Sequence, residues 1–186
     1  MSRQSNTGLS HGTSGSPQEN LESLEYAAKV QEIENKLRKE FESPEQRNIS
    51  VESVSNLEHT ENFIEGGIKH IFEGEINHRG EAKGYHYEGI ENTAGQVIPG
   101  TRTTPNAHGV YRGNVTVNGV TKRGFSSFFP QSWSPQQVVN SINQAYANRE
   151  FVQGTRNTYK GTSSNGVSIY MYINRNGKII SAFPEE

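Results

Sequence analysis

Two Asn-Gly dipeptides, each placed between runs of alternating β-branched or aromatic residues, constrain the fold of this chain most strongly. They occur at residues 118–119, within NVTVNGVTKR, and at residues 176–177, within VSIYMYINRNGKII. Asn-Gly is the preferred sequence of the two-residue type I′ turn, because both central residues must adopt a positive φ. The pattern predicts two β-hairpins: one carries Lys122 on its second strand, and one joins strand 167–173 to strand 178–183. Two hairpins indicate an antiparallel sheet.

The segment between these hairpins predicts a helix with a well-defined beginning. In SWSPQQVVNSINQAYANREF, Ser134 can serve as the N-cap, Pro135 suits the first helical position, and Gln137 completes a capping box. Apolar residues then recur at helical spacing and predict a buried stripe of Val138, Val139, Ile142, Ala145 and Tyr146. The sheet and the helix together predict an α+β fold, in which an antiparallel β-sheet body is packed with helices.

Three segments of different composition divide the chain. Residues 1–18 contain mostly Ser, Gly, Gln and Asn, which predicts a disordered arm. Residues 19–65 are predicted to hold an amphipathic helix, over about 19–41, and a linker, since Pro44 cannot continue a helix. This helix is expected to dock on the body, to bind a partner or to dimerise, and the sequence leaves these alternatives open. Residues 66–186 form the predicted folded domain.

Composition argues against several classes of protein. The chain has no Cys and no Asp, so disulfides, thiolate zinc sites and the carboxylate sites of two-metal nucleases are not expected. No apolar run approaches the roughly 18 residues of a membrane span, and the N-terminal residues lack the hydrophobic centre of a secretory signal, so no membrane association is expected.

The charge is distributed unevenly along the chain. Residues 1–65 carry twelve Glu against six Lys and Arg, a net charge of −6, whereas residues 66–186 carry eight Glu against twelve Lys and Arg, a net charge of +4. A basic domain suits a polyanionic ligand, because cationic surface raises the local concentration of phosphate groups. An ordinary mixed surface explains the same charge, so both interpretations stand.

Three of the six histidines fall within residues 69–89, a stretch rich in Gly and Glu that can bury little. His70, His78 and His86 are spaced by eight residues, which fits neither one face of a helix nor the usual short-spaced zinc ligands, so a metal site is not expected. A purely structural role for each histidine stays open. The other interpretation is an acid–base pair, since an ordinary imidazole pKa of about 6.5 allows one ring to be neutral and the other charged near neutral pH.

Three stretches carry a resemblance to a known family. HIFEGEINHRGEAKGYHYEG, VTVNGVTKRGFSSFFPQSWSPQQV and GKIISAFPEE supply, in this order, two spaced histidines, a strand lysine, an FFPxSWS helix start and a terminal aromatic-proline pair. In these features the chain resembles the bacterial branch of the EndoU endoribonucleases, which includes many toxin domains of contact-dependent and other polymorphic toxin systems. The resemblance covers about residues 66 to 186 and implies a fold related to that of barnase, colicin ribonuclease domains and RelE.

The resemblance implies a metal-independent cleavage of RNA that needs no cofactor. It makes His70, His86 and Lys122 the catalytic residues. One imidazole would take the proton of a ribose 2′-hydroxyl, which attacks the adjacent phosphorus, and the other would protonate the departing 5′-oxygen, leaving a 2′,3′-cyclic phosphate and a 5′-hydroxyl. His86 is expected to be the base and His70 the acid, an order that the sequence alone does not fix. Lys122 would stabilise the extra negative charge on phosphorus.

Three further residues are expected to bind the substrate. Side chains two and four positions apart on a strand share a face, which would place Ser126 beside Lys122, and Ser181 beside Phe183. In the family, a serine four residues after the lysine helps to recognise uracil, and a Thr-x-Tyr pair near the C-terminus lies beside it. Cleavage at or near uridine is therefore expected, although Phe183 lacks the family tyrosine's hydroxyl. Alternatively, Ser126 is a surface serine and Phe183 a core aromatic residue.

The expected partner is single-stranded or loop RNA, including a tRNA loop, in the cytoplasm. If the domain is a toxin, delivery from another cell and an acidic cognate immunity protein over the basic cleft are expected. Three alternatives stay open: a non-catalytic RNA- or partner-binding module on the same fold, a metal-dependent nuclease, and a stand-alone RNA-processing enzyme. In the turn-rich loop 92–113, Arg102 and His108 are candidates for contact with RNA, whereas His78 is expected on the surface. The oligomeric state is not predicted.

Overall fold

The structure is a computed structural model that describes residues 25–33, 54 and 56–186. It divides into two compact units, residues 1–42 and 43–186, each of which is described by itself. No helix within the described ranges is long and apolar enough to cross a membrane.

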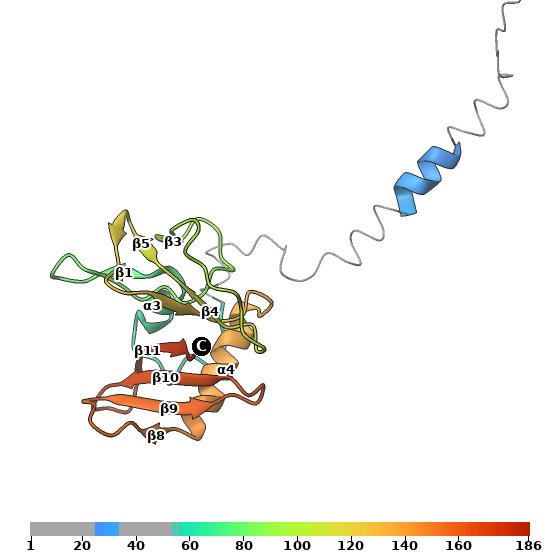
Figure 1. Cartoon of the computed structure of the whole chain (residues 1–186). Coiled ribbons are helices and arrows are strands. Elements are labelled where there is room, and N and C mark those ends of the chain that lie inside the picture. Colours follow the sequence, from blue (N-terminus) through green and yellow to red (C-terminus); the bar gives the residue numbers. More distant parts are fainter. Residues whose placement is uncertain (1–24, 34–53, 55) are drawn as a thin grey trace, which may run out of the picture. The chain divides into compact units, whose positions relative to one another are not determined.

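In the first unit, residues 25–33 form a helix whose side chains are almost all exposed (Figure 1). The rest of the helix predicted over 19–41 and the arm predicted over 1–18 lie outside the described residues. The amphipathic character of the whole segment therefore stays a prediction.

Over residues 56–186, the second unit consists mainly of short strands, together with the short helix α3 and the longer helix α4 (Figure 1). In chain order the elements are α3 (Gly67–Glu73), β1 (Glu75–Ile76), β2 (Ala82–Lys83), β3 (Gly95–Val97), β4 (Tyr111–Gly113), β5 (Val115–Val117), β6 (Val120–Thr121), β7 (Ser126–Phe128), α4 (Pro135–Ala147), β8 (Glu150–Phe151), β9 (Thr158–Thr162), β10 (Ser168–Ile173) and β11 (Ile179–Pro184). All ladders between these strands are antiparallel. The predicted α+β class with an antiparallel body is therefore confirmed.

The strands form two groups. One is a four-stranded sheet in the order β11-β10-β9-β8, drawn in orange and red in Figure 1. The other comprises the smaller sheets β3-β5-β6, β4-β7 and β1-β2. Figure 1 shows β11 as the strand of the four-stranded sheet that lies nearest the smaller sheets.

The first predicted hairpin is confirmed. Asn118 and Gly119 both adopt positive φ, 47° and 78°, and β5 pairs with β6 across this turn. Lys122 lies one residue beyond β6 and not on it, so its predicted place on the strand needs correction by one residue. Its N–H still donates to the Val115 carbonyl at 2.9 Å, so the hydrogen bonding of the hairpin extends to Lys122.

The second hairpin joins the predicted strands, since β10 pairs with β11, but through a different turn. Only Gly177 has a positive φ, 76°, whereas Asn176 does not. The Gly177 N–H donates to the Asn174 carbonyl at 3.0 Å, and the Asn174 N–H donates to the Lys178 carbonyl at 2.8 Å. The type I′ turn predicted here is therefore wrong, because the connection is longer and needs a left-handed residue only at its last position.

The predicted helix is α4, and its capping box is complete. The Ser134 hydroxyl accepts the Gln137 N–H at 3.2 Å, while the Gln137 side chain accepts the Ser134 N–H at 2.7 Å. The predicted stripe is fully buried at Val138, Val139, Ile142 and Ala145 and partly buried at Tyr146. At Gly161 of β9, an added Cβ would lie 1.9 Å from the Ala145 carbonyl oxygen, so glycine is required where the sheet crosses α4.

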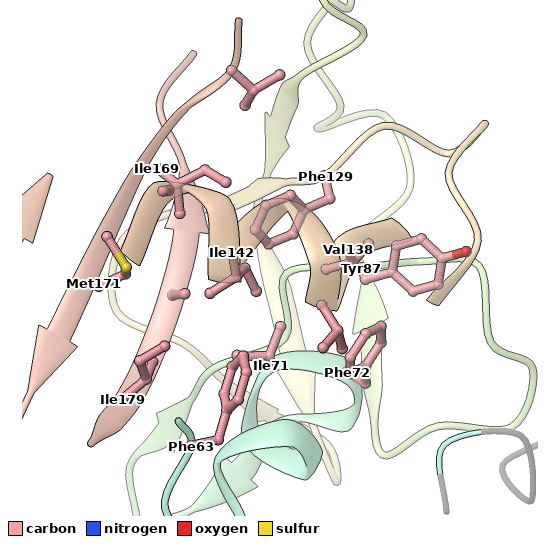
Figure 2. Close-up of a cluster of buried hydrophobic side chains, with 14 of the residues drawn as sticks. Phe63, Ile71, Phe72, Tyr87, Phe129, Val138, Ile142, Ile169, Met171 and Ile179 are labelled. Atoms are coloured by element: carbon pink, nitrogen blue, oxygen red, sulfur yellow. The ribbon is translucent and has the colours of Figure 1, made fainter. Parts of the chain in front are cut away.

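The main core lies between α3, α4 and the four-stranded sheet (Figure 2). Its labelled side chains come from all three elements and from the segments beside them: Phe63, Ile71, Phe72, Tyr87, Phe129, Val138, Ile142, Ile169, Met171 and Ile179. A second cluster holds the smaller sheets together, with Tyr85, Val97, Tyr111, Val115 and Phe128. Segments from both clusters contribute to the cavity described next.

Candidate active site

Residues far apart in the chain meet at one cavity of about 420 Å³. Five parts of the chain form its wall: α3, β2 with the segment after it, the region from Lys122 to β7, strand β10 and strand β11. The lining residues are His70, Lys83, Gly84, His86, Lys122, Phe125, Ser127, Tyr172, Ile180, Ser181 and Phe183. Five of the six residues predicted to act on the substrate are in this set. The sixth, Ser126, is not on the cavity wall.

His70 is anchored to a carboxylate. It lies on α3, and its Nδ1 is 2.9 Å from Oε1 of Glu75. An ionised carboxylate can only accept, so Nδ1 carries a proton and donates it. This arrangement places a negative partner beside any positive charge that His70 acquires. The His70 carbonyl also accepts the Tyr85 N–H at 2.9 Å, which ties α3 to the segment that carries His86.

The segment before His86 has an unusual backbone. Gly84 and Tyr85 both adopt positive φ, 75° and 64°. At Gly84 an added Cβ would lie 2.1 Å from the His70 carbonyl oxygen, so only glycine allows this close approach. For a bulky residue such as Tyr85, the left-handed conformation costs on the order of 1–3 kcal/mol. The backbone hydrogen bond from the His86 N–H to the Ile71 carbonyl, at 2.7 Å, helps to hold the segment in place.

His86 is buried, with 6% of its surface exposed, and its ring orientation is fixed. Its Nδ1 is 2.8 Å from the backbone carbonyl oxygen of Ser127. Because a carbonyl oxygen cannot donate, Nδ1 must carry the hydrogen, and in the neutral ring the other nitrogen, Nε2, keeps its lone pair. A neutral His86 is therefore already in the tautomer that can accept a proton through Nε2.

The charge of His86 is set by its surroundings. Burial lowers its pKa well below the ordinary value, and the positive charge of Lys122 and the nearby His70 lower it further, while the hydrogen bond to Ser127 opposes them. A charged imidazole is poorly solvated in this position, which is the physical reason for the shift. His86 is thus neutral at pH 7.

Acidification is expected to destabilise the fold through this histidine. In the unfolded chain His86 binds a proton near its ordinary pKa of 6.5, whereas in the fold its pKa is lowered, so the unfolded state holds more protons below pH 6.5. The free energy of unfolding should fall by up to about 1.4 kcal/mol per pH unit as the pH drops from 6.5 toward 5. Urea unfolding across this range measures the slope. His86→Asn should remove this contribution, and a slope unchanged in that variant would contradict the assignment.

Lys122 is held by two neutral partners. Its Nζ donates to the Gly84 carbonyl at 3.0 Å and to the Ser126 hydroxyl at 2.7 Å. Burial lowers its pKa to about 8, and repulsion from the charge of Lys83 adds to the effect. At pH 7 the side chain is still positive, and it lies at the same cavity as both imidazoles.

Ser126 lies behind Lys122. It is fully buried, and its hydroxyl donates to the Gly84 carbonyl at 3.2 Å while it accepts from Lys122. The predicted proximity of Ser126 and Lys122 is found, but the two residues do not share a strand, because the chain turns at Arg123 and Gly124 before β7 begins. Its contacts suit the orientation of Lys122 better than direct contact with a base.

Ser181 and Phe183 lie on β11 and both line the cavity. The Phe183 ring stacks on the His86 ring, with centroids 5.4 Å apart and planes inclined by 27°. It also stacks on Tyr170, at 5.7 Å, and contacts Tyr172, at 5.6 Å. Phe183 therefore covers His86 and continues into an aromatic cluster on this face of the sheet.

A family model described as Bacterial EndoU nuclease matches residues 65–186. The chain belongs to the bacterial EndoU nuclease family. The resemblance drawn from the sequence is thus confirmed, and the family match covers residues 65–186.

One relative of this EndoU domain is a protein named Toxin from Bacillus cereus, which is 56% identical over 138 residues. The alignment covers 73% of this chain and 25% of that protein, so the chain spans about a quarter of the relative's length at most. No solved structure matches the chain.

The EndoU cavity contains residues that the sequence analysis missed. Tyr172 and Phe125 are large and exposed, by 39% and 55%, and Lys83 adds a second cation. Tyr172 could have been found from the pairing of the two predicted hairpin strands. It is the partner of Ser181, and side chains of directly paired residues lie on the same face of a sheet. Phe125 precedes β7 in a turn region, where no periodicity marks it.

Three other candidates from the sequence lie elsewhere in the EndoU domain. His78 is exposed and does not line the cavity. Arg102 is bound by both carboxylate oxygens of Glu88, at 2.9 and 2.6 Å, and lines a separate hollow of about 280 Å³. His108 is exposed, with its ring near Gly166. Within the described residues, no group of three or more His, Cys, Asp or Glu side chains is arranged to hold a metal ion.

Proposed function

We propose that this EndoU domain is a metal-independent endoribonuclease that cleaves single-stranded or loop RNA, at or near uridine, by attack of a ribose 2′-hydroxyl on the adjacent phosphorus. The observation that supports this reaction best is the different hydrogen bonding of two imidazoles at one cavity. His86 donates from Nδ1 to a carbonyl and is neutral, whereas His70 donates from Nδ1 to a carboxylate. A pair of this kind can supply a base and an acid at the same pH.

In the proposed reaction, Nε2 of His86 takes the proton of the 2′-hydroxyl as the 2′-oxygen bonds to phosphorus. The bond from phosphorus to the 5′-oxygen breaks, and protonated His70 gives its proton to that oxygen. The products are a 2′,3′-cyclic phosphate and a 5′-hydroxyl, and solvent restores both histidines. Lys122, positive and partly desolvated, stabilises the negative charge that grows on the phosphoryl oxygens. Ser126 supports this step by fixing the ammonium group.

The substrate base is proposed to lie against Phe183, with Ser181 offering a hydroxyl beside it and Tyr172 a second aromatic surface. Aromatic rings bind any base by stacking, and hydrogen bonds to the base edge give preference for one. DNA should not be cleaved, because it lacks the 2′-hydroxyl that acts as the nucleophile.

The test is incubation with an end-labelled RNA that contains a single uridine, in EDTA, beside the same sequence as DNA and a His86→Ala variant. We expect cleavage of the RNA by the native chain alone, with a 2′,3′-cyclic phosphate end. Loss of activity in EDTA would favour a metal-dependent nuclease. Binding of RNA without cleavage would favour a non-catalytic module on the same fold.

We further propose that the domain acts as a toxin. The support is the B. cereus relative, whose name is Toxin. An acidic immunity protein that covers the basic cavity is then the expected partner, and the cytoplasm of a recipient cell is the expected site of action. Co-expression with the product of the neighbouring reading frame, followed by purification of the complex, tests this role. Absence of a complex would favour a stand-alone RNA-processing enzyme.

Replacement of Phe183 by alanine is expected to weaken substrate binding. A base–aromatic stack contributes about 1–3 kcal/mol, so KM should rise about 5- to 150-fold. Phe183→Tyr supplies a hydroxyl while keeping the ring, and should raise the preference for uridine over cytidine. Initial rates on RNAs that differ only at the cleaved base measure both effects. An unchanged KM in Phe183→Ala would show that the ring serves only to cover His86.

A further inference from the structure

A second cavity lies at one end of the four-stranded sheet. Its volume is about 640 Å³, and it is lined by Arg156, Asn157, Tyr159, Ile173, Asn174 and Arg175. The two arginines come from the connections between β8 and β9 and between β10 and β11. These connections are held together, because the Ile173 N–H donates to the Asn157 carbonyl at 3.0 Å. The hollow is thus a fixed feature of the sheet end.

The two arginines of this cavity have no carboxylate partner. Within the described residues, neither makes a hydrogen bond, an ion pair or a ring contact, and no acidic residue lines the hollow. Most other arginines of the domain are engaged: Arg102 with Glu88, Arg112 with Glu186, Arg123 with Glu81, and Arg149 with the Tyr146 ring and carbonyl. Arg156 and Arg175 are both exposed, so their guanidinium groups are free to meet an anion, and guanidinium binds phosphate through paired N–H groups.

The remaining wall suits a nucleic-acid backbone. Asn157 and Asn174 supply side-chain amides, which can donate to phosphate or sugar oxygens, and Tyr159 supplies an aromatic ring. The Phe151 ring packs edge-on against Tyr159, at 5.4 Å, and is itself 40% exposed. Arginine, amide and aromatic groups side by side are the combination that binds single-stranded RNA.

The position of this cavity relative to the active site is set by β10. Tyr172 lines the active-site cavity, and the next two residues, Ile173 and Asn174, line the second one. Arg175 lies just beyond the end of β10, in the turn that leads to β11, so the two cavities adjoin the same end of this strand. Because Tyr172 and Ile173 point to opposite faces of the sheet, an RNA strand joining both cavities would pass over the sheet end near residues 174–177.

We propose that Arg156 and Arg175 form a phosphate-binding exosite that holds the RNA backbone outside the active site. The inference rests on the proposed ribonuclease function and names a second contact of the same substrate. An RNA of several nucleotides engages both cavities, whereas a dinucleotide reaches only the active site.

The test measures the cleavage kinetics of the native chain, of the double variant Arg156→Gln/Arg175→Gln and of the single variant Arg175→Gln. The substrates are a uridine-containing dinucleotide and a 20-nucleotide RNA. We expect KM for the long RNA to rise while kcat and the kinetics on the dinucleotide stay unchanged. Arg79→Gln is the matched control for Arg175→Gln, because Arg79 is exposed and lines neither cavity. Thermal unfolding checks that all variants are folded.

A binding measurement separates this proposal from the proposed function. Anisotropy of a labelled 20-nucleotide RNA is followed against salt in the His86→Asn background, where cleavage is expected to be too slow to interfere. The slope of log Kobs against log salt should become shallower by about 0.7 for each arginine removed. A shallower slope supports the exosite even if the native chain cleaves no RNA. An unchanged slope overturns the proposal, and so does an equal loss of activity on the dinucleotide and on the long RNA. If the slope is unchanged, an acidic protein becomes the candidate occupant of the second cavity.

Discussion

Replacement of His86 by asparagine is expected to lower kcat/KM for RNA by a factor of about 10²–10⁴, the usual contribution of a general base. The asparagine amide can still donate to the Ser127 carbonyl, so the segment after Gly84 keeps its anchor. The ring nitrogen that would take the 2′-hydroxyl proton is lost. Initial rates at pH 7, together with the affinity for RNA, measure the effect, and the affinity should change little.

The matched control for this variant is His78→Asn. His78 is exposed and does not line the cavity, so the same chemical change there should leave kcat/KM unchanged. Assays are run well below the unfolding midpoint of each variant, since the loss of a buried ring also costs stability. Activity of His86→Asn within a few-fold of the native chain would mean that another group is the base.

Replacement of Lys122 by methionine is expected to lower kcat by about 10²–10³, the cost of removing one donor that stabilises an oxyanion. The change keeps most of the apolar stem and removes the charge, so the affinity for RNA should fall less than kcat. Single-turnover rates at saturating enzyme separate the two quantities.

The same lysine predicts a pH effect. Its pKa is lowered to about 8, so the ammonium group is charged below that value and loses its charge as the pH rises through it. The activity of the native chain should therefore decline above about pH 8. In Lys122→Arg the guanidinium stays charged, so the residual activity should not decline in this range. A decline at the same pH in Lys122→Arg would mean that a different group sets the alkaline limit.

Local sequence patterns predicted much of the fold, because short-range interactions decide these elements. The capping box at Ser134 and the Asn118-Gly119 turn involve neighbours only, and both are found. Loop length was harder to predict: the second loop has three residues between Asn174 and Lys178, with one left-handed glycine, where two residues were predicted. A further Asn-Gly, at residues 165–166, lies in the connection between β9 and β10 and was not identified as a turn from the sequence.

The candidate site was predicted through motif order more than through geometry. The proximity of Lys122 and Ser126 was inferred from a shared strand, yet it arises because the chain reverses between them. The partners that orient the two histidines, Glu75 and the Ser127 carbonyl, could not be predicted, since they depend on how β1 follows α3 and on how β7 packs beside His86. The order of the motifs therefore indicated which residues meet, whereas tertiary contacts decide which ring nitrogen of each imidazole carries the hydrogen.

The position of β11 in the chain has a consequence for biosynthesis. β11 follows every other element of the site, yet it supplies Ser181, Phe183 and the core residue Ile179. Because translation runs from the N-terminus, both histidines and the lysine leave the ribosome before the strand that closes their cavity. A nascent chain therefore lacks this wall of the cavity until β11 has emerged. Vectorial synthesis alone thus delays the appearance of the assembled cavity while the chain is still attached to a ribosome, itself largely made of RNA.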